Sequence, residues 1–237
     1  KVIYTPIHGS GNIPVRKILD RIGIKNLFVV PEQEKPDGNF PTVISPNPEN
    51  AEAFTIAIEY AKKQNADLVF GTDPDSDRIG VVVRNADGGY EVLNGNQTGV
   101  LLCEYILRKS KENGILPVNS AVIKTIVTTE MVTAVAKEYN TELFDVLTGF
   151  KFIGEQIGIL ENQGEENRFI FGYEESYGYV AGSYVRDKDA VVGSMLICEM
   201  ACYYYKQGKS LVDVYAELEN EFGFFHNSQC SFNFEGQ

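Results

Sequence analysis

The chain has 237 residues, of which 43% are hydrophobic, and it carries a formal net charge of −12 at pH 7. Length and composition predict one large or two medium globular domains with a sizeable core. The acidic balance argues against nucleic-acid and membrane-surface partners, because both are anionic themselves. No apolar run reaches the roughly 18 residues that a bilayer span needs, and the four cysteines lack the paired spacing of a zinc site. The cytoplasm is the expected compartment.

The first stretch of the chain alternates strands and helices, which is typical of an α/β domain with a mixed, largely parallel sheet flanked by helices. Its predicted elements are a strand at 2–4, a helix at 13–22, a strand at 26–30, a helix at 52–63, a strand at 68–70 and a hairpin of 79–84 with 90–93. A glycine-rich turn follows the first strand, and His8 within it either contacts a phosphate or holds the turn. We place the end of this first domain, residues 1–94, directly after the hairpin.

Three carboxylates follow the strand at 68–70, where Asp73, Asp75 and Asp77 alternate with other residues and Arg78 comes next. Side chains at alternate positions of an extended chain point to one face, so these three are expected to converge. Anions so close repel one another unless a cation lies among them, and hard oxygen ligands in a compact loop favour Mg²⁺. The sequence therefore predicts a magnesium site in this loop.

Three other interpretations of the acidic loop compete with a magnesium site. A solvated turn is one, since Asp, Pro and Ser are common turn formers. A calcium EF-hand loop is excluded, because Arg78 and Arg84 stand where that loop needs Gly and Glu. A phosphatase with an Asp nucleophile would place the nucleophile directly after a buried strand, whereas Gly71 and Thr72 separate Asp73 from the predicted strand. This separation disfavours the phosphatase.

The alternation of strands and helices starts again after residue 94, which indicates a second α/β domain at residues 95–222. Its predicted elements are helices at 97–108, 130–139, 152–160, 190–206 and 211–222 and strands at 121–127, 142–146 and 168–172. Residues 223–237 are expected to begin a linker to a missing C-terminal domain. The chain also opens directly on a strand, so we expect it to be a piece of a longer protein.

Polar side chains at strand ends make up the candidate site of the second domain. Lys151 follows a glycine at a helix start, where a phosphate would meet an ammonium group and a positive dipole end, although a solvated surface lysine is the alternative. Glu174 and Ser176 follow a strand beside aromatic residues, a combination that suits recognition of sugar hydroxyls. Arg186 and Lys188 either bind a phosphate or pair with the aspartates beside them.

Together these stretches resemble, in the same chain order, the α-D-phosphohexomutases, the family of the phosphoglucomutases and phosphomannomutases. The sequence GTDPDSDR at residues 71–78 is similar to the family's metal loop, TGFK at 148–151 to its phosphate-handling turn and EES at 174–176 to its sugar-recognition loop. Tyr173 stands where the family usually has glycine. The resemblance covers nearly the whole chain and is strongest to the phosphoglucomutase and phosphopentomutase branch.

The resemblance implies an enzyme of four domains, of which this chain holds the second and third. Domains 1 and 4, which carry the phosphorylated serine and a phosphate clamp in the family, are expected outside this chain. Ser45 is no substitute for that serine, because its flanking residues resemble a loop of the second domain and no histidine follows it. The implied isomerase interconverts glucose 1-phosphate and glucose 6-phosphate through a phosphoserine and glucose 1,6-bisphosphate.

The resemblance also implies a role for each candidate residue. Mg²⁺ would be held by Asp73, Asp75 and Asp77, and Lys151 is the candidate catalytic residue. The candidate substrate-binding residues are Arg78, Glu174, Ser176, Arg186 and Lys188. Because the domain with the nucleophile is missing, the fragment itself is expected to be inactive. A non-catalytic magnesium-dependent module that binds sugar phosphates and a phosphatase with an Asp nucleophile are the alternatives.

Overall fold

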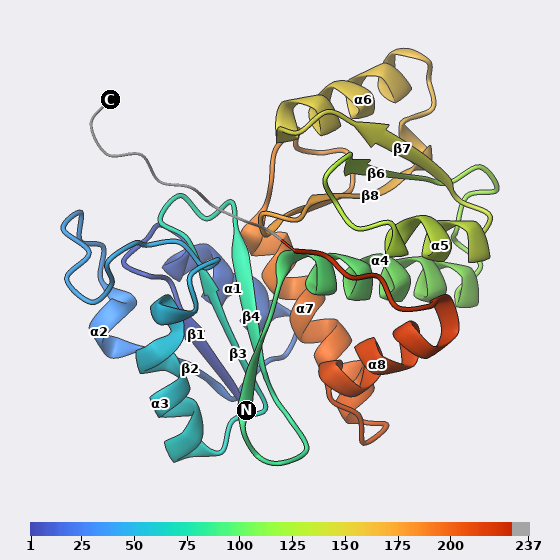
Figure 1. Cartoon of the computed structure of the whole chain (residues 1–237). Coiled ribbons are helices and arrows are strands. Elements are labelled where there is room, and N and C mark those ends of the chain that lie inside the picture. The colour runs from blue at the N-terminus through green and yellow to red at the C-terminus, as the bar shows by residue number, and fades with distance from the viewer. Residues whose placement is uncertain (229–237) are drawn as a thin grey trace.

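The computed structural model describes residues 1–228, which form two α/β units, each built on one sheet (Figure 1). The first sheet has the strand order β2-β1-β3-β4-β5, in which β2, β1 and β3 are parallel and β4 and β5 are added by antiparallel pairing. The second sheet has the order β7-β6-β8-β9, in which β9 alone pairs antiparallel. The predicted class of two consecutive α/β domains with mixed sheets is confirmed.

The elements of the first unit occupy residues 2–93. Its strands are β1 (Val2–Thr5), β2 (Leu27–Val29), β3 (Leu68–Thr72), β4 (Ile79–Arg84) and β5 (Tyr90–Leu93). Its helices are α1 (Asn12–Arg21), α2 (Pro31–Glu34), a 3-10 turn (Ala51–Phe54) and α3 (Thr55–Gln64).

The elements of the second unit follow from residue 95. Its strands are β6 (Ala121–Thr125), β7 (Glu142–Val146), β8 (Phe169–Glu174) and β9 (Gly178–Ala181). Its helices are α4 (Gly95–Glu112), α5 (Met131–Glu138), α6 (Phe150–Asn162), a 3-10 turn (Glu166–Arg168), α7 (Ala190–Tyr205) and α8 (Leu211–Phe222). None of the helices within residues 1–228 combines the length and the apolar character that crossing a membrane requires.

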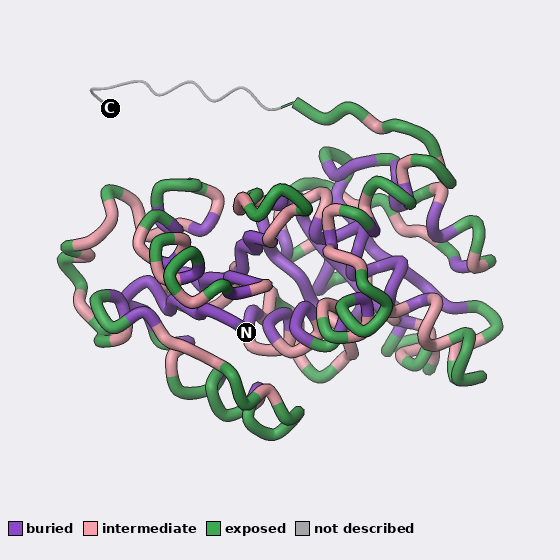
Figure 2. Tube along the Cα trace, turned by 90° about the horizontal axis from the view of Figure 1, so that it is seen from below, coloured by how far each residue is buried: buried purple, intermediate pink, exposed green. Residues whose placement is uncertain are grey.

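Successive residues of each strand face opposite helix layers, because side chains alternate across a strand. In β1, Ile3 belongs to the apolar cluster with α3, whereas Tyr4 belongs to the cluster that includes α1. In β6, Ile123 packs in the cluster with α6, whereas Val122 faces the layer of α4 and α5. Figure 2 shows the buried chain running through the middle of both units, with the exposed segments around it.

Helix α7 connects the two units. It follows the second sheet in the sequence, yet it packs beside α1 and against β3 and β4 of the first sheet. Gly193 of α7 lies so close to β4 that a Cβ there would be 3.1 Å from Ile79 Cγ2. One apolar cluster consequently extends from the first sheet through α7 and α4 into the second sheet. The domain boundary at residue 94 therefore remains a prediction from the sequence, and the apolar packing of the structure extends across it.

Several element ends differ from the predicted ones. Strand β3 continues to Thr72 rather than Phe70, because Gly71 lets the chain run close to Thr5 Cγ2 and the ring of Phe54, 2.8 and 2.9 Å from where a Cβ would lie. Strand β9 (Gly178–Ala181) was not predicted from the sequence. Helix α6 begins at Phe150, two residues early. Of the predicted linker, residues 223–228 contain no helix or strand, and 229–237 lie outside the described residues.

Candidate active site

The acidic loop is the turn between β3 and β4. One oxygen of each of Asp73, Asp75 and Asp77 can be chosen so that all three lie within 4.8 Å of one another. The chain is not extended here, so the reasoning from alternate positions was wrong. A tight turn brings the carboxylates together instead, with Ser76 at φ +63° and Asp73 Oδ1 accepting hydrogen bonds from the N–H groups of Asp77 (3.0 Å) and Arg78 (2.9 Å).

The glycine-rich turn after β1 packs directly against the acidic loop. Ser10 N donates to Pro74 O at 2.8 Å, and a Cβ on Gly9 would lie 2.5 Å from Pro74 Cα. A Cβ on Gly11 would lie 2.7 Å from Ser76 Oγ. The glycines are therefore required by close packing against the loop. These contacts explain the glycines of the turn without a bound phosphate.

His8 is buried within the same turn and is fixed by the long connection after β2. Its Nδ1 lies 3.0 Å from Lys35 O and its Nε2 lies 2.8 Å from Thr42 Oγ1. Both ring nitrogens are thus engaged inside the protein. Of the two roles predicted for His8, these contacts favour holding the turn.

The electrostatics of the acidic loop suit a cation. Burial raises the pKa of Asp73 to about 7, the N–H of Arg78 acts against this rise, and Asp77 and Asp75 add to it. Three carboxylates with hard oxygen atoms form a donor set that fits Mg²⁺, whose charge would offset their repulsion. The guanidinium of Arg78 pairs with Glu49, and its Nε lies 3.9 Å from Asp77 Oδ1.

Backbone hydrogen bonds join the acidic loop to the loop between β8 and β9. Ile79 N donates to Tyr177 O at 3.1 Å, and Arg78 forms an isolated antiparallel bridge with Gly178. Each loop connects a parallel strand to its antiparallel neighbour, β3 to β4 and β8 to β9. The predicted metal loop and the predicted sugar loop are therefore in direct contact, although about 100 residues separate them in the chain.

Lys188 reaches from the second unit to the acidic loop. Its Nζ lies 3.0 Å from Asp77 Oδ2 and 3.3 Å from Asp187 Oδ1, and the side chain is 14% exposed. The methylene groups pass directly over Gly178, where a Cβ would collide with them. The ammonium also lies 5.3 Å from the ring centre of Phe150, at the start of α6. One lysine thus touches the metal loop, the sugar loop and the phosphate-handling turn.

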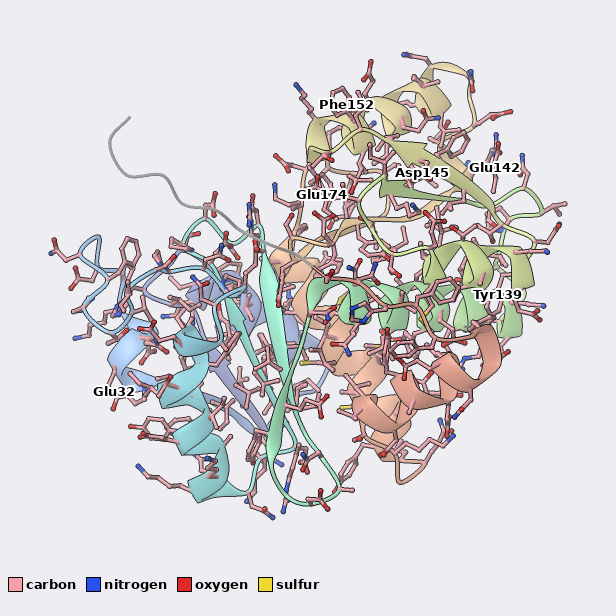
Figure 3. All side chains as sticks on the ribbon, in the orientation of Figure 1. Glu32, Tyr139, Glu142, Asp145, Phe152 and Glu174 are labelled. Atoms are coloured by element: carbon pink, nitrogen blue, oxygen red, sulfur yellow. The ribbon has the colours of Figure 1, made fainter. Side chains whose placement is uncertain are left out.

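Glu174 lies at the end of β8 and connects the sugar loop to the turn before α6. Its Oε1 accepts a hydrogen bond from Gly149 N at 2.8 Å, and burial raises its pKa. Glu174 and Phe152 lie at one end of the second sheet, whereas Glu142, which begins β7, lies at the other (Figure 3). The candidate residues therefore gather at the carboxyl ends of the strands, where sites in such sheets form.

Two predicted residues stand apart from this centre. Lys151 is exposed in the first turn of α6, with its Nζ 4.8 Å from the ring centre of Phe152. The guanidinium of Arg186 pairs with Glu161 near the far end of α6 and donates to the carbonyl of Ser183. The structure thus brings together the acidic loop, Arg78, Glu174, Ser176 and Lys188, with Lys151 at the edge and Arg186 directed elsewhere.

Two other polar residues at the site, Glu49 and Glu175, were given no role by the sequence reasoning. Glu49, which holds Arg78, lies in the long irregular connection after β2, and such connections are often functional. Glu175 accepts hydrogen bonds from Thr125, the last residue of β6, and from Thr128, which lies just after that strand. Two threonines at a strand end and a second glutamate beside Glu174 were the only sequence signals for this contact.

Comparison with known proteins defines the class. Residues 1–89 match the family model for phosphoglucomutase/phosphomannomutase, alpha/beta/alpha domain II, and residues 94–222 match the model for domain III. The chain belongs to the phosphoglucomutase/phosphomannomutase family, as its motifs predicted.

Among individual relatives, the phosphoglucomutase of Staphylococcus epidermidis (strain ATCC 12228 / FDA PCI 1200) is 39% identical over 236 residues, which is 100% of this chain and 42% of the relative. The chain thus spans less than half the length of the curated relatives it matches.

Solved structures share the fold. A putative phosphomannomutase from Thermus thermophilus aligns with a TM-score of 0.74 at 21% identity, covering 94% of this chain and 46% of that one. An Aspergillus fumigatus N-acetylphosphoglucosamine mutase in complex with GlcNAc-6P and magnesium aligns with a TM-score of 0.59 at 15% identity, covering 92% of this chain and 48% of that one.

Proposed function

We propose that this chain is the central part of a phosphosugar mutase that interconverts a hexose 1-phosphate and a hexose 6-phosphate, with glucose as the expected sugar. The observation that carries the proposal is the contact between the acidic loop and the sugar loop, with Lys188 reaching across both. A phosphoryl group and a sugar ring could be held side by side there. The names of the curated relatives support glucose, and the fungal mutase with magnesium and GlcNAc-6P supports the ligand class.

The acidic loop is proposed to hold Mg²⁺ through Asp73, Asp75 and Asp77. Such an ion supplies charge neutralisation for a phosphoryl group when bound. Arg78 adds a cation whose direction is fixed by Glu49. A cation that is already oriented costs little reorganisation during the reaction, which is how preorganised charge accelerates phosphoryl transfer.

The second unit is proposed to bind the sugar and the remaining phosphate. Glu174 and Ser176 bind the ring hydroxyls, and Lys151 contacts a phosphate at the positive end of α6 and shares in proton transfer. Lys188 and Arg186 are the proposed partners of the distal phosphate. The guanidinium of Arg186 is already paired with Glu161. Of these two, Lys188 has the better supported position.

The nucleophilic serine and a phosphate clamp are proposed to lie in domains 1 and 4, in the part of the protein that this chain does not cover. The chain alone would then bind sugar phosphate and metal without turnover, because nothing in it accepts and returns a phosphoryl group. Positioning by the absent clamp would be lost as well, and good positioning can contribute roughly 7 to 11 kcal/mol.

A phosphatase with Asp73 as nucleophile is the alternative function, and the position of Asp73 in the structure bears on it. Because β3 extends to Thr72, Asp73 follows a buried strand directly, and the separation that argued against a nucleophile is wrong. However, Asp73 is buried and its Oδ1 accepts two backbone hydrogen bonds, so this oxygen is occupied. These contacts favour a metal ligand over a nucleophile, and family membership gives the phosphatase no support.

The proposal is tested by incubating the purified chain with glucose 1-phosphate and Mg²⁺ and measuring binding by calorimetry, glucose 6-phosphate by a coupled assay and free phosphate. A polypeptide extended by the flanking coding sequence is assayed in parallel, with Asp73→Ala as the control for contaminating enzyme. We expect binding alone for the chain and conversion for the extended form. Phosphate release would favour the phosphatase, and conversion by the chain itself would contradict the domain assignment.

A further inference from the structure

Glu175 is a carboxylate of the sugar loop to which the proposed function gives no role. Its Oε2 lies 3.2 Å from Thr125 Oγ1 and 3.0 Å from Thr128 Oγ1, and both hydroxyls donate toward it. The two hydroxyl oxygens lie 2.8 Å apart. Both threonines are buried, at 0% and 3% exposure. Each hydroxyl has a single proton, so when both donate to Glu175 the approach between the two hydroxyls is a close contact and not a third hydrogen bond. Glu175, Thr125 and Thr128 therefore form a triad held by the carboxylate, which joins the sugar loop to the end of β6.

The threonine side of the triad is rigidly held. Lys124, which is fully buried, contacts Asp145 Oδ1 at 2.7 Å, Glu130 Oε1 at 3.0 Å and the carbonyl of Thr128 at 3.4 Å. The next residue, Thr129, donates its N–H to Asn96 Oδ1 at 3.0 Å. The turn after β6 is thus held at Lys124 and at Thr129. Because Glu175 is bonded to the threonine hydroxyls of this turn, its carboxylate is held in place as well.

The sugar loop is correspondingly fixed around Ser176. Glu174 is bonded to Gly149 N, Glu175 to the two threonines, and the carbonyl of Tyr177 to Ile79 N. Tyr177 also has φ +67°, a conformation that non-glycine residues adopt only under constraint. Ser176 lies between these anchors and is half-buried, and within residues 1–228 its hydroxyl makes no hydrogen bond. The residues on both sides of Ser176 are therefore held in place, and the Ser176 hydroxyl is left available to bind a ligand.

We propose that Glu175 is a positioning residue for sugar recognition, and that its triad with Thr125 and Thr128 sets the direction of the Ser176 hydroxyl and of Glu174. The inference rests on the proposed function, because it assumes that those two residues bind the sugar. Loss of one triad hydroxyl leaves the half-buried Glu175 carboxylate with one donor fewer and lets the loop sample other positions. The affinity for a sugar phosphate then falls by about tenfold, whereas the divalent-metal affinity is unchanged.

Matched variants of Thr128 separate positioning from packing. Thr128→Val keeps the shape and removes the hydroxyl, whereas Thr128→Ser keeps the hydroxyl and removes the methyl group. If the triad positions the loop, Val impairs binding of glucose 1-phosphate and Ser restores it. If Thr128 only fills space, Ser is the more damaging change. Affinities for glucose 1-phosphate and Mn²⁺ are measured by calorimetry on the 237-residue chain.

A second readout does not depend on sugar binding. Hydrogen exchange of the peptide covering residues 174–178 should become at least severalfold faster in Thr128→Val and remain at the unmodified rate in Thr128→Ser. Unchanged exchange in the Val variant would overturn the inference. If the unmodified chain fails to bind glucose 1-phosphate, the proposed function fails, while exchange still decides whether the triad positions the loop.

Discussion

Gly11 gives a direct test of how closely the first strand's turn supports the acidic loop. A Cβ at this position would lie 2.7 Å from both Ser76 Oγ and Thr72 Oγ1 and 2.8 Å from Tyr4 Oη. Tyr4 and Thr72 are fully buried and bonded to each other at 3.0 Å, so neither can move aside easily. The backbone at Gly11, with φ −64°, suits alanine, and the change therefore adds steric overlap without backbone strain.

We expect Gly11→Ala to lower the free energy of unfolding by about 1–3 kcal/mol, the usual cost of overpacking a rigid site. For a chain of this size that corresponds to a fall in Tm of roughly 2–12 °C. Ser76 would be displaced, and because it lies between Asp75 and Asp77 the affinity for Mn²⁺ should fall as well. Scanning calorimetry without metal and a metal titration measure the two effects separately.

Gly158→Ala is the matched control. Gly158 lies within α6, where a Cβ would have no neighbour within 4 Å. Removing a glycine from a helix interior should raise the stability by about 0.5–1 kcal/mol and leave metal binding unchanged. If Gly11→Ala matches the unmodified chain in both Tm and metal affinity, the turn does not support the loop in the way described.

Three further outcomes concern the charges of the acidic loop. Lys188→Met should raise Mg²⁺ affinity about tenfold by removing an ammonium that competes for Asp77, and equal affinities in calorimetry would show no competition. Asp75→Asn should weaken metal binding without lowering Tm, since Asp75 is exposed and repelled by its neighbours; a large loss of Tm would refute this. The raised pKa of Asp73 favours its protonated form in the folded state, so metal-free stability should fall as pH rises from about 4 to 7. Mg²⁺ affinity should fall below pH 7 for the same reason. Melting curves of Asp73→Asn should show a smaller slope than the unmodified chain, because the raised pKa values of Glu104 and Glu174 remain, and an equal slope would refute the role of Asp73.

Local patterns made the fold class and the acidic loop predictable. Alternating strands and helices leave a period in the sequence, and three aspartates in one short loop can only lie close together. The prediction did not depend on the right backbone conformation, because either a tight turn or an extended chain would place Asp73 near Asp77. Local patterns also placed Glu174 correctly at a strand end.

Contacts between distant segments could not be predicted. Lys188 was expected to bind phosphate or pair with its neighbours, and its contact with Asp77 depends on how two units pack. The bonds of Glu175 to Thr125 and Thr128 join residues about 50 positions apart. Polar pairs of this kind carry no period, since their energy comes from three-dimensional placement of single groups.

The position of α7 also affects how the protein is made. One face of the first sheet depends on α7, which ends roughly 110 residues after β5 in the chain. At ribosomal rates of about 5–20 residues per second, the part of that face that α1 does not cover stays exposed for on the order of 5–20 s after its strands emerge. The nascent chain must therefore hold an apolar surface in a partly folded state, and the step that completes the first sheet comes late in synthesis, when Ala190–Tyr205 leaves the ribosome.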